Sequence, residues 1–310
     1  SSFVARYPHD VFHTPEYMRH AARHEGGAAC AVWGRGDEAE FLVPLLLRPI
    51  PDELGDGDLG LDATSPYGYP SPLCAGPGAA AEADSFFKQF REIADERQIV
   101  SVFLRLNPLL PLPVELSGCR DELVHRGPTV YIDLEQSADE QWSETRRDHR
   151  SGIRRLKRDG FHVTFDDWSL YGGFYEIYLS TMKRVAATPR YFFGASYFED
   201  LWTMLGDEQL HLATAFSPAG EPASMALFTE CSGIVQFLLS GTGNSFRKQA
   251  PSKLLLHETR QWFAERGNKV LHLGGGLAGA EDSLFLFKAG FSKQRAEFST
   301  LQLVIAPKRY

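Results

Sequence analysis

The sequence predicts an α/β protein of two tandem units, each built on a mixed, mostly antiparallel β-sheet. Short runs rich in apolar and β-branched residues alternate with longer runs in which apolar residues recur at helical spacing. The order of these runs in the second half of the chain has a loose counterpart in the first half. The length of 310 residues also suits two domains of about 150 residues each.

Turn and cap residues divide the second half of the chain into its elements. Gly160 and Gly267 stand where helices typically end, and Pro251 stands where one typically begins. A turn around Gly220, flanked by two prolines, separates two strand-like runs. In order, we expect a basic helix, a strand, two helices, three strands, a helix, a strand, a short helix and a last strand, at residues 139–159, 161–165, 169–185, 195–205, 210–216, 223–230, 233–242, 251–267, 269–273, 282–289 and 298–305.

The first half has a similar plan, in which mixed strands precede one long helix and a following strand. A segment rich in Pro, Gly and Tyr interrupts this plan. We place the boundary near residues 136–140, which gives domains 1–138 and 139–310, and we leave open whether the last strand packs on the first domain. The expected elements are a helix, two strands, a helix and a strand, at residues 14–24, 28–33, 40–48, 80–97 and 99–106.

The composition excludes several classes of protein. The 32 Lys and Arg residues against 40 Asp and Glu residues give a net charge of −8, whereas a general nucleic-acid coat needs a broad basic surface. The longest apolar run has seven residues, 41–47, and a membrane-spanning helix needs about 20. The first ten residues lack the basic start and apolar middle of a signal peptide. These features argue against membrane insertion and secretion.

The cysteines indicate a reducing compartment. Cys30, Cys74, Cys119 and Cys231 are too widely spaced for a zinc site or a dense disulfide framework. We therefore expect free thiols, no bound metal and a cytoplasmic protein.

One local stretch opposes the acidic total. Between residues 146 and 158, seven of thirteen residues are Lys or Arg and one is Asp, a local charge of +6. Like charges four residues apart destabilise a helix by about 0.2–0.5 kcal/mol per pair. An anion on this face would offset that cost, and the phosphates of a nucleic acid or of a nucleotide are candidates. A solvated basic face is the alternative. Four arginines recur at this spacing and would share one helical face: Arg146, Arg150, Arg154 and Arg158.

The element order of the second half resembles that of the GNAT acyltransferase fold. Together with the looser first half, this order predicts two tandem GNAT-like acyltransferase domains with mixed, mostly antiparallel sheets. No long heptad hairpin lies between residues 160 and 252, so we expect no coiled-coil arm.

Three stretches resemble the Fem family, whose members use aminoacyl-tRNA to form peptide bonds on peptidoglycan precursors and on some peptide natural products. LGGGLAGAEDSLFLFKAGF at 273–291 is similar to the family's glycine loop and the L-F-x-F-K-x-G-F helix that follows it. RSGIRRLKRDG at 150–160 is similar to R-x-x-I-R-x-x-x-x-x-G. SPYGYPSPL at 65–73 lies where relatives place an aromatic loop facing the cleft between domains. The resemblance covers nearly the whole chain, and the first stretch is the most specific.

The resemblance implies roles for individual residues. Lys288 matches the lysine that stabilises the oxyanion when an amine attacks the aminoacyl ester, and Phe287 matches its aromatic neighbour. A fixed cation in a dry cleft stabilises that developing charge more than it stabilises the neutral ester. Arg150 matches the arginine that holds the acceptor diphosphate. The other substrate-binding candidates are Arg154, Gly275, Tyr67 and Tyr69.

The N-terminal helix departs from the family pattern. Peptidoglycan-acting members supply a lysine there, but residues 12–27 contain none, and Arg19 or Arg23 would be an imperfect substitute. This difference favours another acceptor, such as the free amine of a peptide antibiotic. The chain thus resembles the Fem-like alanyl-tRNA-dependent transferases of pacidamycin-type uridyl-peptide assembly.

The loop before the helix at 251–267 separates two possible donors. GNAT enzymes that use acetyl-CoA cradle its pyrophosphate on backbone N–H groups in a (Q/R)-x-x-G-x-(G/A) loop. The matching positions here are Arg247, Ala250 and Ser252, and Pro251 removes one donor. This change favours an aminoacyl-tRNA donor. The candidates for binding tRNA phosphates are Arg146, Arg147, Arg158, Arg247, Lys248 and Lys253.

The resemblance implies a monomeric aminoacyltransferase that moves an aminoacyl group from aminoacyl-tRNA to a primary amine of a peptide acceptor, either a natural-product peptide or a peptidoglycan precursor. Aminolysis of an ester requires neither a metal nor a cofactor besides this co-substrate. Two alternatives stay open: an acetyl-CoA-dependent N-acyltransferase, and a non-catalytic GNAT-like module that binds nucleotide or RNA.

Overall fold

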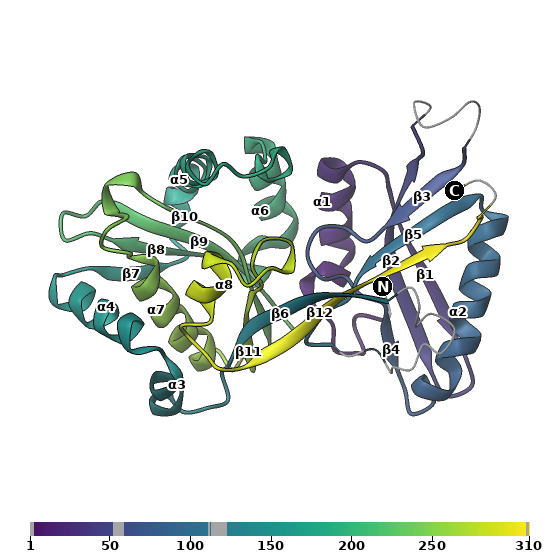
Figure 1. The fold of residues 1–310 in the computed structure, drawn as a ribbon, viewed down its shortest axis with the longest axis horizontal. Helices are drawn as coiled ribbons and strands as arrows, with labels where there is room; N and C mark the ends of the chain where they lie inside the picture. The colour runs from purple at the N-terminus through teal and green to yellow at the C-terminus, as the bar shows by residue number, and fades with distance from the viewer. Residues whose placement is uncertain (1–2, 52–58, 111, 113–122, 308–309) are drawn as a thin grey trace. The chain divides into compact units, whose positions relative to one another are not determined.

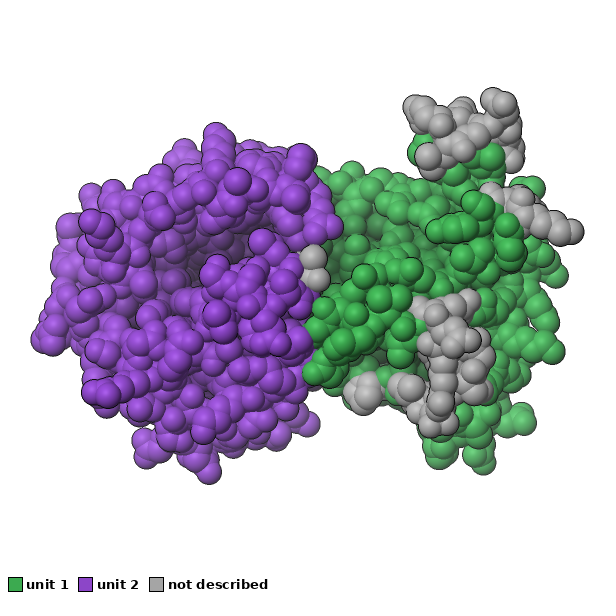
Figure 2. Space-filling view, in the orientation of Figure 1, with its two compact units in different colours: residues 1–127, 297–310 green, residues 128–296 purple. Residues whose placement is uncertain are grey.

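The computed structural model describes residues 3–51, 59–110, 112, 123–307 and 310, and forms two compact units (Figures 1 and 2). Unit 1 comprises residues 1–127 and 297–310, and unit 2 comprises residues 128–296. The division falls within β6 (Leu123–Asp133), ahead of the boundary expected at 138/139. The end of the chain returns to unit 1, because β12 (Arg295–Val304) pairs antiparallel with β5 (Ile99–Arg105).

Unit 1 packs helices against a sheet whose strand order is β1-β2-β3-β5-β12. The β3–β5 pair is parallel, and β4 joins the free part of β2 in antiparallel register. Alternate residues of the strands and one face of α2, including Phe87 and Phe90, form the core. The remaining elements are η1 (Val11–His13), α1 (Pro15–Glu25), β1 (Ala28–Arg35), β2 (Glu40–Pro49), β3 (Leu61–Thr64), β4 (Leu73–Ala75) and α2 (Ala79–Glu96).

Unit 2 has the strand order β6-β11-β10-β9-β8-β7. The β10–β11 pair is parallel, and every other neighbouring pair in this order is antiparallel. Its core joins the sheet to α4 and α7 through Ile153, Leu156, Leu255 and Phe263, each 1% exposed or less. The remaining elements are α3 (Ala138–Glu144), α4 (Arg147–Arg158), β7 (His162–Phe165), η4 (Trp168–Leu170), α5 (Tyr171–Arg184), η5 (Pro189–Tyr191), α6 (Ala195–Gln209), β8 (Leu210–Phe216), β9 (Pro222–Cys231), β10 (Ile234–Thr242), η6 (Asn244–Phe246), α7 (Ser252–Glu265), β11 (Val270–Gly274), η7 (Leu277–Gly279) and α8 (Ser283–Lys288).

The predicted α/β fold class is confirmed. Each expected strand and helix of the second half is present, with boundaries that differ by a few residues, except the basic helix over 139–159. That prediction is wrong, because the chain breaks between α3 and α4. Thr145 is extended there, and its Oγ1 accepts a hydrogen bond from Arg260, while the Arg146 amide donates to Gly290 O. The C-terminal end of α4 lies where expected. Gly160 adopts φ +86°, and the amides of Gly160 and Phe161 donate to Lys157 O and Leu156 O.

Three further strands, β3, β4 and β6, were not anticipated from the sequence. Among the described residues, no helix is long and apolar enough to cross a membrane. No group of three His, Cys, Asp or Glu side chains in the described ranges is arranged to hold a metal ion. Cys30, Cys74 and Cys231 form no disulfide bond among the described residues, and Cys119 lies outside them.

The buried His211 of β8 contacts Glu230 of β9 and Asp166, the residue directly after β7. The His211 side chain is 1% exposed, with Nδ1 2.9 Å from Asp166 Oδ2 and Nε2 2.9 Å from Glu230 Oε2. Burial lowers the pKa of His211, but the two carboxylates more than offset this effect and raise it above its ordinary value of 6.5. Burial alone would raise the pKa of Glu230, but His211, Asn268 and Arg266 lower it to about 2.

We expect His211→Gln to lower the free energy of unfolding by about 3 kcal/mol at pH 5.5, the cost of removing one partner of a buried ion pair. The raised pKa of His211 contributes stability that is present below pH 6.5 and is lost as the pH rises through the folded-state pKa. The lowered pKa of Glu230 contributes stability above pH 4.5. Urea unfolding at pH 5.5 and pH 9 measures this, and an equal loss at both pH values would contradict it.

Candidate active site

Lys288 occupies the last position of α8 and is 8% exposed. Its Nζ donates a hydrogen bond to Gly275 O at 2.7 Å. Burial lowers the pKa of Lys288 to about 8, and the carboxylate of Asp282 acts in the opposite direction. The side chain is therefore a cation at neutral pH that burial has largely removed from water. Such a group stabilises negative charge more strongly than a lysine in water.

Asp282 joins the helix that carries Lys288 to the glycine loop that faces it. Asp282 Oδ1 accepts a hydrogen bond from Phe285 N at 2.9 Å, which caps α8, and Oδ2 accepts one from Leu277 N at 3.0 Å. A Cβ atom at Gly276 would overlap Ala280 O and approach Asp282 Oδ1, so this position requires glycine. The loop is thus tightly closed, and it presents Gly275 O to the ammonium group.

The glycine loop follows the point where two parallel strands stop pairing. β10 and β11 pair from Ile234 with Val270 to Gln236 with His272, and β11 then shifts register against β6 by a bulge between His272 and Gly274. Gln236 Oε1 lies 2.7 Å from His272 Nδ1. Burial lowers the pKa of His272 to about 3, and the nearby Lys288 acts in the same direction. His272 is therefore neutral at physiological pH and leaves Lys288 as the cation of this site.

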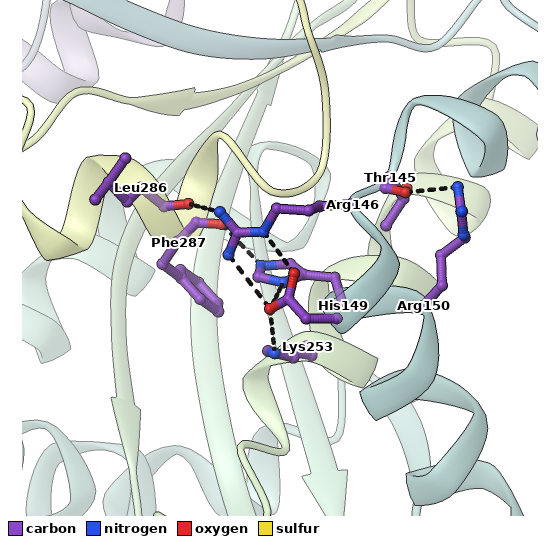
Figure 3. A network of polar contacts seen from close by, with 8 residues as sticks. Thr145, Arg146, His149, Arg150, Lys253, Leu286 and Phe287 are labelled. Atoms are coloured by element: carbon purple, nitrogen blue, oxygen red, sulfur yellow. Dashed lines mark hydrogen bonds and ion pairs between the residues drawn. The ribbon is translucent and has the colours of Figure 1, made fainter.

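A charged network on α4 lies beside α8 (Figure 3). Asp148 is its centre: its carboxylate contacts the Arg146 guanidinium, His149 Nδ1 at 3.0 Å and Lys253 Nζ at 3.2 Å. These donors, Arg146 above all, hold the pKa of Asp148 far below its usual range. Arg146 also donates to Leu286 O at 3.3 Å, and His149 Nε2 lies 2.9 Å from Phe287 O. The predicted phosphate ligands Arg146 and Lys253 thus have an internal carboxylate partner.

The other arginines of α4 have distinct surroundings. Arg150 Nη1 donates to the carbonyls of Trp142, Ser143 and Thr145, which end α3. The Arg154 guanidinium lies 5.3 Å from the centre of the Trp142 ring. The prediction that four arginines share one face of a single helix is incomplete, because Arg146 precedes α4 as its N-cap. An open pocket of about 510 Å³ is lined by Arg147, Arg150, Ser151, Arg154, Arg155 and Arg158.

The loop before α7 uses several of its amides internally. Gln249 N donates to Phe246 O, Ala250 N lies within hydrogen-bond distance of Phe246 O and Arg247 O, and Lys253 N donates to Ala250 O. Ala250 has φ +54°. A pyrophosphate cradle needs amides that point away from the loop, and those of Gln249 and Ala250 already donate within it, while Pro251 has none. The side chains of Arg247 and Lys248 are exposed on it.

Tyr67 and Tyr69 belong to unit 1, on a loop whose backbone is held by polar side chains. Tyr67 N donates to the Glu25 carboxylate at 2.9 Å, and Tyr17 Oη donates to Tyr67 O at 3.0 Å. Asn107 Nδ2 donates to Tyr69 O at 3.2 Å. The Tyr69 ring packs edge-on against Phe12 and Phe298. The loop is thus preformed, with both tyrosine rings half-buried.

The structure therefore brings Lys288, Gly275 and Phe287 together, and joins them through α4 to Arg146 and Lys253 within unit 2. Sequence reasoning did not find His149, Asp148, Asp282 or His272. Asp282 had a detectable signal, because Asp is a strong N-cap residue ahead of an apolar run. Asp148, His149 and His272 belong to no recognisable motif. Their contacts with Lys253, Phe287 and Gln236 join segments that lie far apart in the sequence.

Comparisons with known proteins agree with this architecture. Residues 143–282 match the family model described as an acetyltransferase (GNAT) domain. A crystal structure of FemX superposes with a TM-score of 0.74 and 15% identity, covering 96% of this chain and 94% of that one. The L-PGS structure from Bacillus licheniformis has a TM-score of 0.55 and 12% identity, covering 93% and 92% of the two chains.

A third structure, the C-terminal domain of a putative lysylphosphatidylglycerol synthetase from Agrobacterium fabrum, has a TM-score of 0.56 and 14% identity, with 93% and 90% coverage. A search of curated protein sequences found no match. At these identities, the structural similarities show that the chain has the Fem-like GNAT fold.

Proposed function

We propose that this protein is an acyltransferase that moves an aminoacyl group from aminoacyl-tRNA to a primary amine of a peptide acceptor. The observation that carries the proposal is the buried Lys288 ammonium, held 2.7 Å from Gly275 O. It lies in a chain whose fold matches that of FemX over 96% of its length. Aminoacyl transfer is a reaction in which one negative charge develops on an oxygen atom, and this site supplies one fixed positive charge.

The proposed reaction uses the two substrates, solvent and Lys288. The neutral acceptor amine attacks the ester carbonyl carbon, and the carbonyl oxygen takes up the negative charge. A Lys288 N–H donates to that oxyanion. The intermediate then collapses, the bond from carbon to the ribose oxygen breaks, and the tRNA leaves with a free terminal hydroxyl after that oxygen takes the proton lost by the amine. Solvent or the substrate's own groups deprotonate the acceptor.

The surface of unit 2 supports a polyanionic donor. Arg147, Arg154 and Arg158 are exposed along α4, and Arg247 and Lys248 are exposed on the loop before α7. Cations spaced along a helix suit the repeated phosphates of an RNA backbone. The internal hydrogen bonds of the Gln249 and Ala250 amides, with Pro251 next to them, argue against a CoA pyrophosphate in this loop.

The acceptor side is proposed from unit 1. Hydrogen bonds from Tyr67 N to Glu25 and from Asn107 to Tyr69 O fix the backbone of the loop that carries Tyr67 and Tyr69. The two aromatic rings on this loop suit a ligand with planar or apolar groups. A natural-product peptide and a peptidoglycan precursor both fit this description. On unit 2, we propose Arg150, whose guanidinium donates to Thr145 O, as a ligand for a phosphate group of a substrate that bears one.

A donor experiment tests the proposal. Purified protein is incubated with pooled radiolabelled aminoacyl-tRNAs or with labelled acetyl-CoA, each with a panel of muropeptide and uridyl-peptide amines. We expect label to transfer from tRNA to an amine, and RNase treatment of the donor to abolish the product. Transfer from acetyl-CoA alone would contradict the proposal. RNA binding without release of deacylated tRNA would identify a non-catalytic module.

A further inference from the structure

A buried histidine connects α4 to the helix that ends in Lys288. The His149 side chain is 1% exposed, with Nδ1 3.0 Å from Asp148 Oδ2 and Nε2 2.9 Å from Phe287 O. Figure 3 shows the His149 ring facing the backbone of Phe287 on α8. Phe287 immediately precedes Lys288, so this contact lies one peptide unit from the residue whose ammonium group faces Gly275 O.

Both neighbours of the ring can only accept hydrogen bonds. Phe287 O is a carbonyl oxygen, and Asp148 is held ionised by Arg146 and Lys253. A neutral imidazole carries one N–H, so the ring donates to both neighbours only when it is protonated, and the neutral tautomer with the proton on Nε2 donates to Phe287 O. Burial lowers the pKa of His149, and the Asp148 carboxylate acts in the opposite direction, whereas Lys253 on α7 acts with burial.

The packing around the ring leaves little freedom. A Cβ atom at Gly290 would lie 2.5 Å from His149 Nε2, so glycine permits this close approach. The Phe287 and Phe291 rings lie 5.4 Å and 4.7 Å from the imidazole, centre to centre. The Gly290 amide also donates to Phe287 O. The end of α8 is thus fixed by the imidazole on one side and by its own C-cap on the other.

We propose that His149 is a positioning residue: by donating to Phe287 O, it fixes the end of α8 and holds the Lys288 ammonium group at Gly275 O. This inference rests on the proposed function for the role of Lys288. It assigns a task to a residue that makes no contact with the reacting atoms, and it explains why the α4 network converges on the backbone of α8.

Two variants separate hydrogen bonding from packing. His149→Gln keeps a side-chain N–H that can reach Phe287 O, and His149→Leu has similar bulk and no donor. We expect His149→Leu to lower kcat by at least tenfold, with KM for both substrates changed less than twofold, and His149→Gln to retain most of kcat. Without the contact, Lys288 would gain solvent, and the alkaline limb of kcat/KM would move upward from about pH 8. The charged groups that face Lys288, Asp282 and neutral His272, are unchanged in both variants.

Hydrogen–deuterium exchange gives a readout that does not depend on turnover. We expect faster amide exchange over residues 283–291 in His149→Leu than in wild type or His149→Gln, with exchange over β8 and β9 unchanged. Equal loss of kcat in both variants with an unmoved alkaline limb, or unchanged exchange over 283–291, would overturn the positioning role. Absence of aminoacyl transfer by the wild-type protein would instead refute the proposed function, while the exchange data would still decide whether His149 holds α8.

Discussion

Lys288→Ala is expected to lower turnover by a factor of about 10² or more, the effect of removing one oxyanion donor from a preorganised site. The cation is buried, and its Nζ is held by Gly275 O before substrate arrives, so no reorganisation is needed when charge develops. Single-turnover rates of aminoacyl transfer measure the loss. Lys293→Ala, at an exposed lysine five residues on, is the matched control and should leave the rate unchanged. An unchanged rate in Lys288→Ala would refute the assignment.

Lys288→Met separates the loss of charge from the loss of structure. Burial holds the pKa of Lys288 at about 8, below its ordinary value of 10.5, so a protonated Lys288 destabilises the folded state at pH 7. We expect Lys288→Met to be as inactive as Lys288→Ala and yet to raise the free energy of unfolding by about 1–3 kcal/mol at pH 7. Urea unfolding measures this change, and its sign distinguishes a functional lysine from one that merely packs.

The exposed arginines of α4 are the proposed ligands of the tRNA phosphates. Replacing Arg147, Arg154 and Arg158 by Gln should weaken tRNA binding by a factor of about 10² at 0.1 M salt, if each contacts one phosphate. The slope of log K against log salt concentration should fall in magnitude by about 2–3. Filter binding or fluorescence anisotropy across a salt series measures both quantities. The three side chains are exposed, so the folded structure should tolerate the change.

A control variant with the same change in net charge separates local from general electrostatics. Lys88, Arg97 and Lys269 are exposed and lie away from α4 in the sequence, and replacing them by Gln removes the same three charges. We expect this control to keep the wild-type salt slope. Equal weakening in both triple variants would show that net charge, rather than the α4 surface, governs binding.

The fold followed from the sequence where local patterns were strong. The Gly160 C-cap and the apolar spacing of α5 and α7 are local features, and these elements lie where expected. β6 was missed because Gly127 and Pro128 within it are typical of a turn. It is a strand because residues 130–133 pair with β11, more than 130 residues later in the chain. The break between α3 and α4 has no glycine or proline to mark it and depends on contacts of Thr145 with Arg260 and of Arg146 with Gly290.

Local spacing and turn residues were enough to predict the α/β class and most helices and strands, and a contiguous motif was enough to single out Lys288 as a candidate. The tertiary structure alone decided what surrounds Lys288: its burial, its hydrogen bond to Gly275 O, and the support of α8 by His149, a residue 138 positions away from Phe287. It also placed the Asp148 carboxylate where Arg146 and Lys253 form ion pairs with it. The physical reason is that desolvation and hydrogen-bond partners depend on which distant segments pack together, and no local spacing records them.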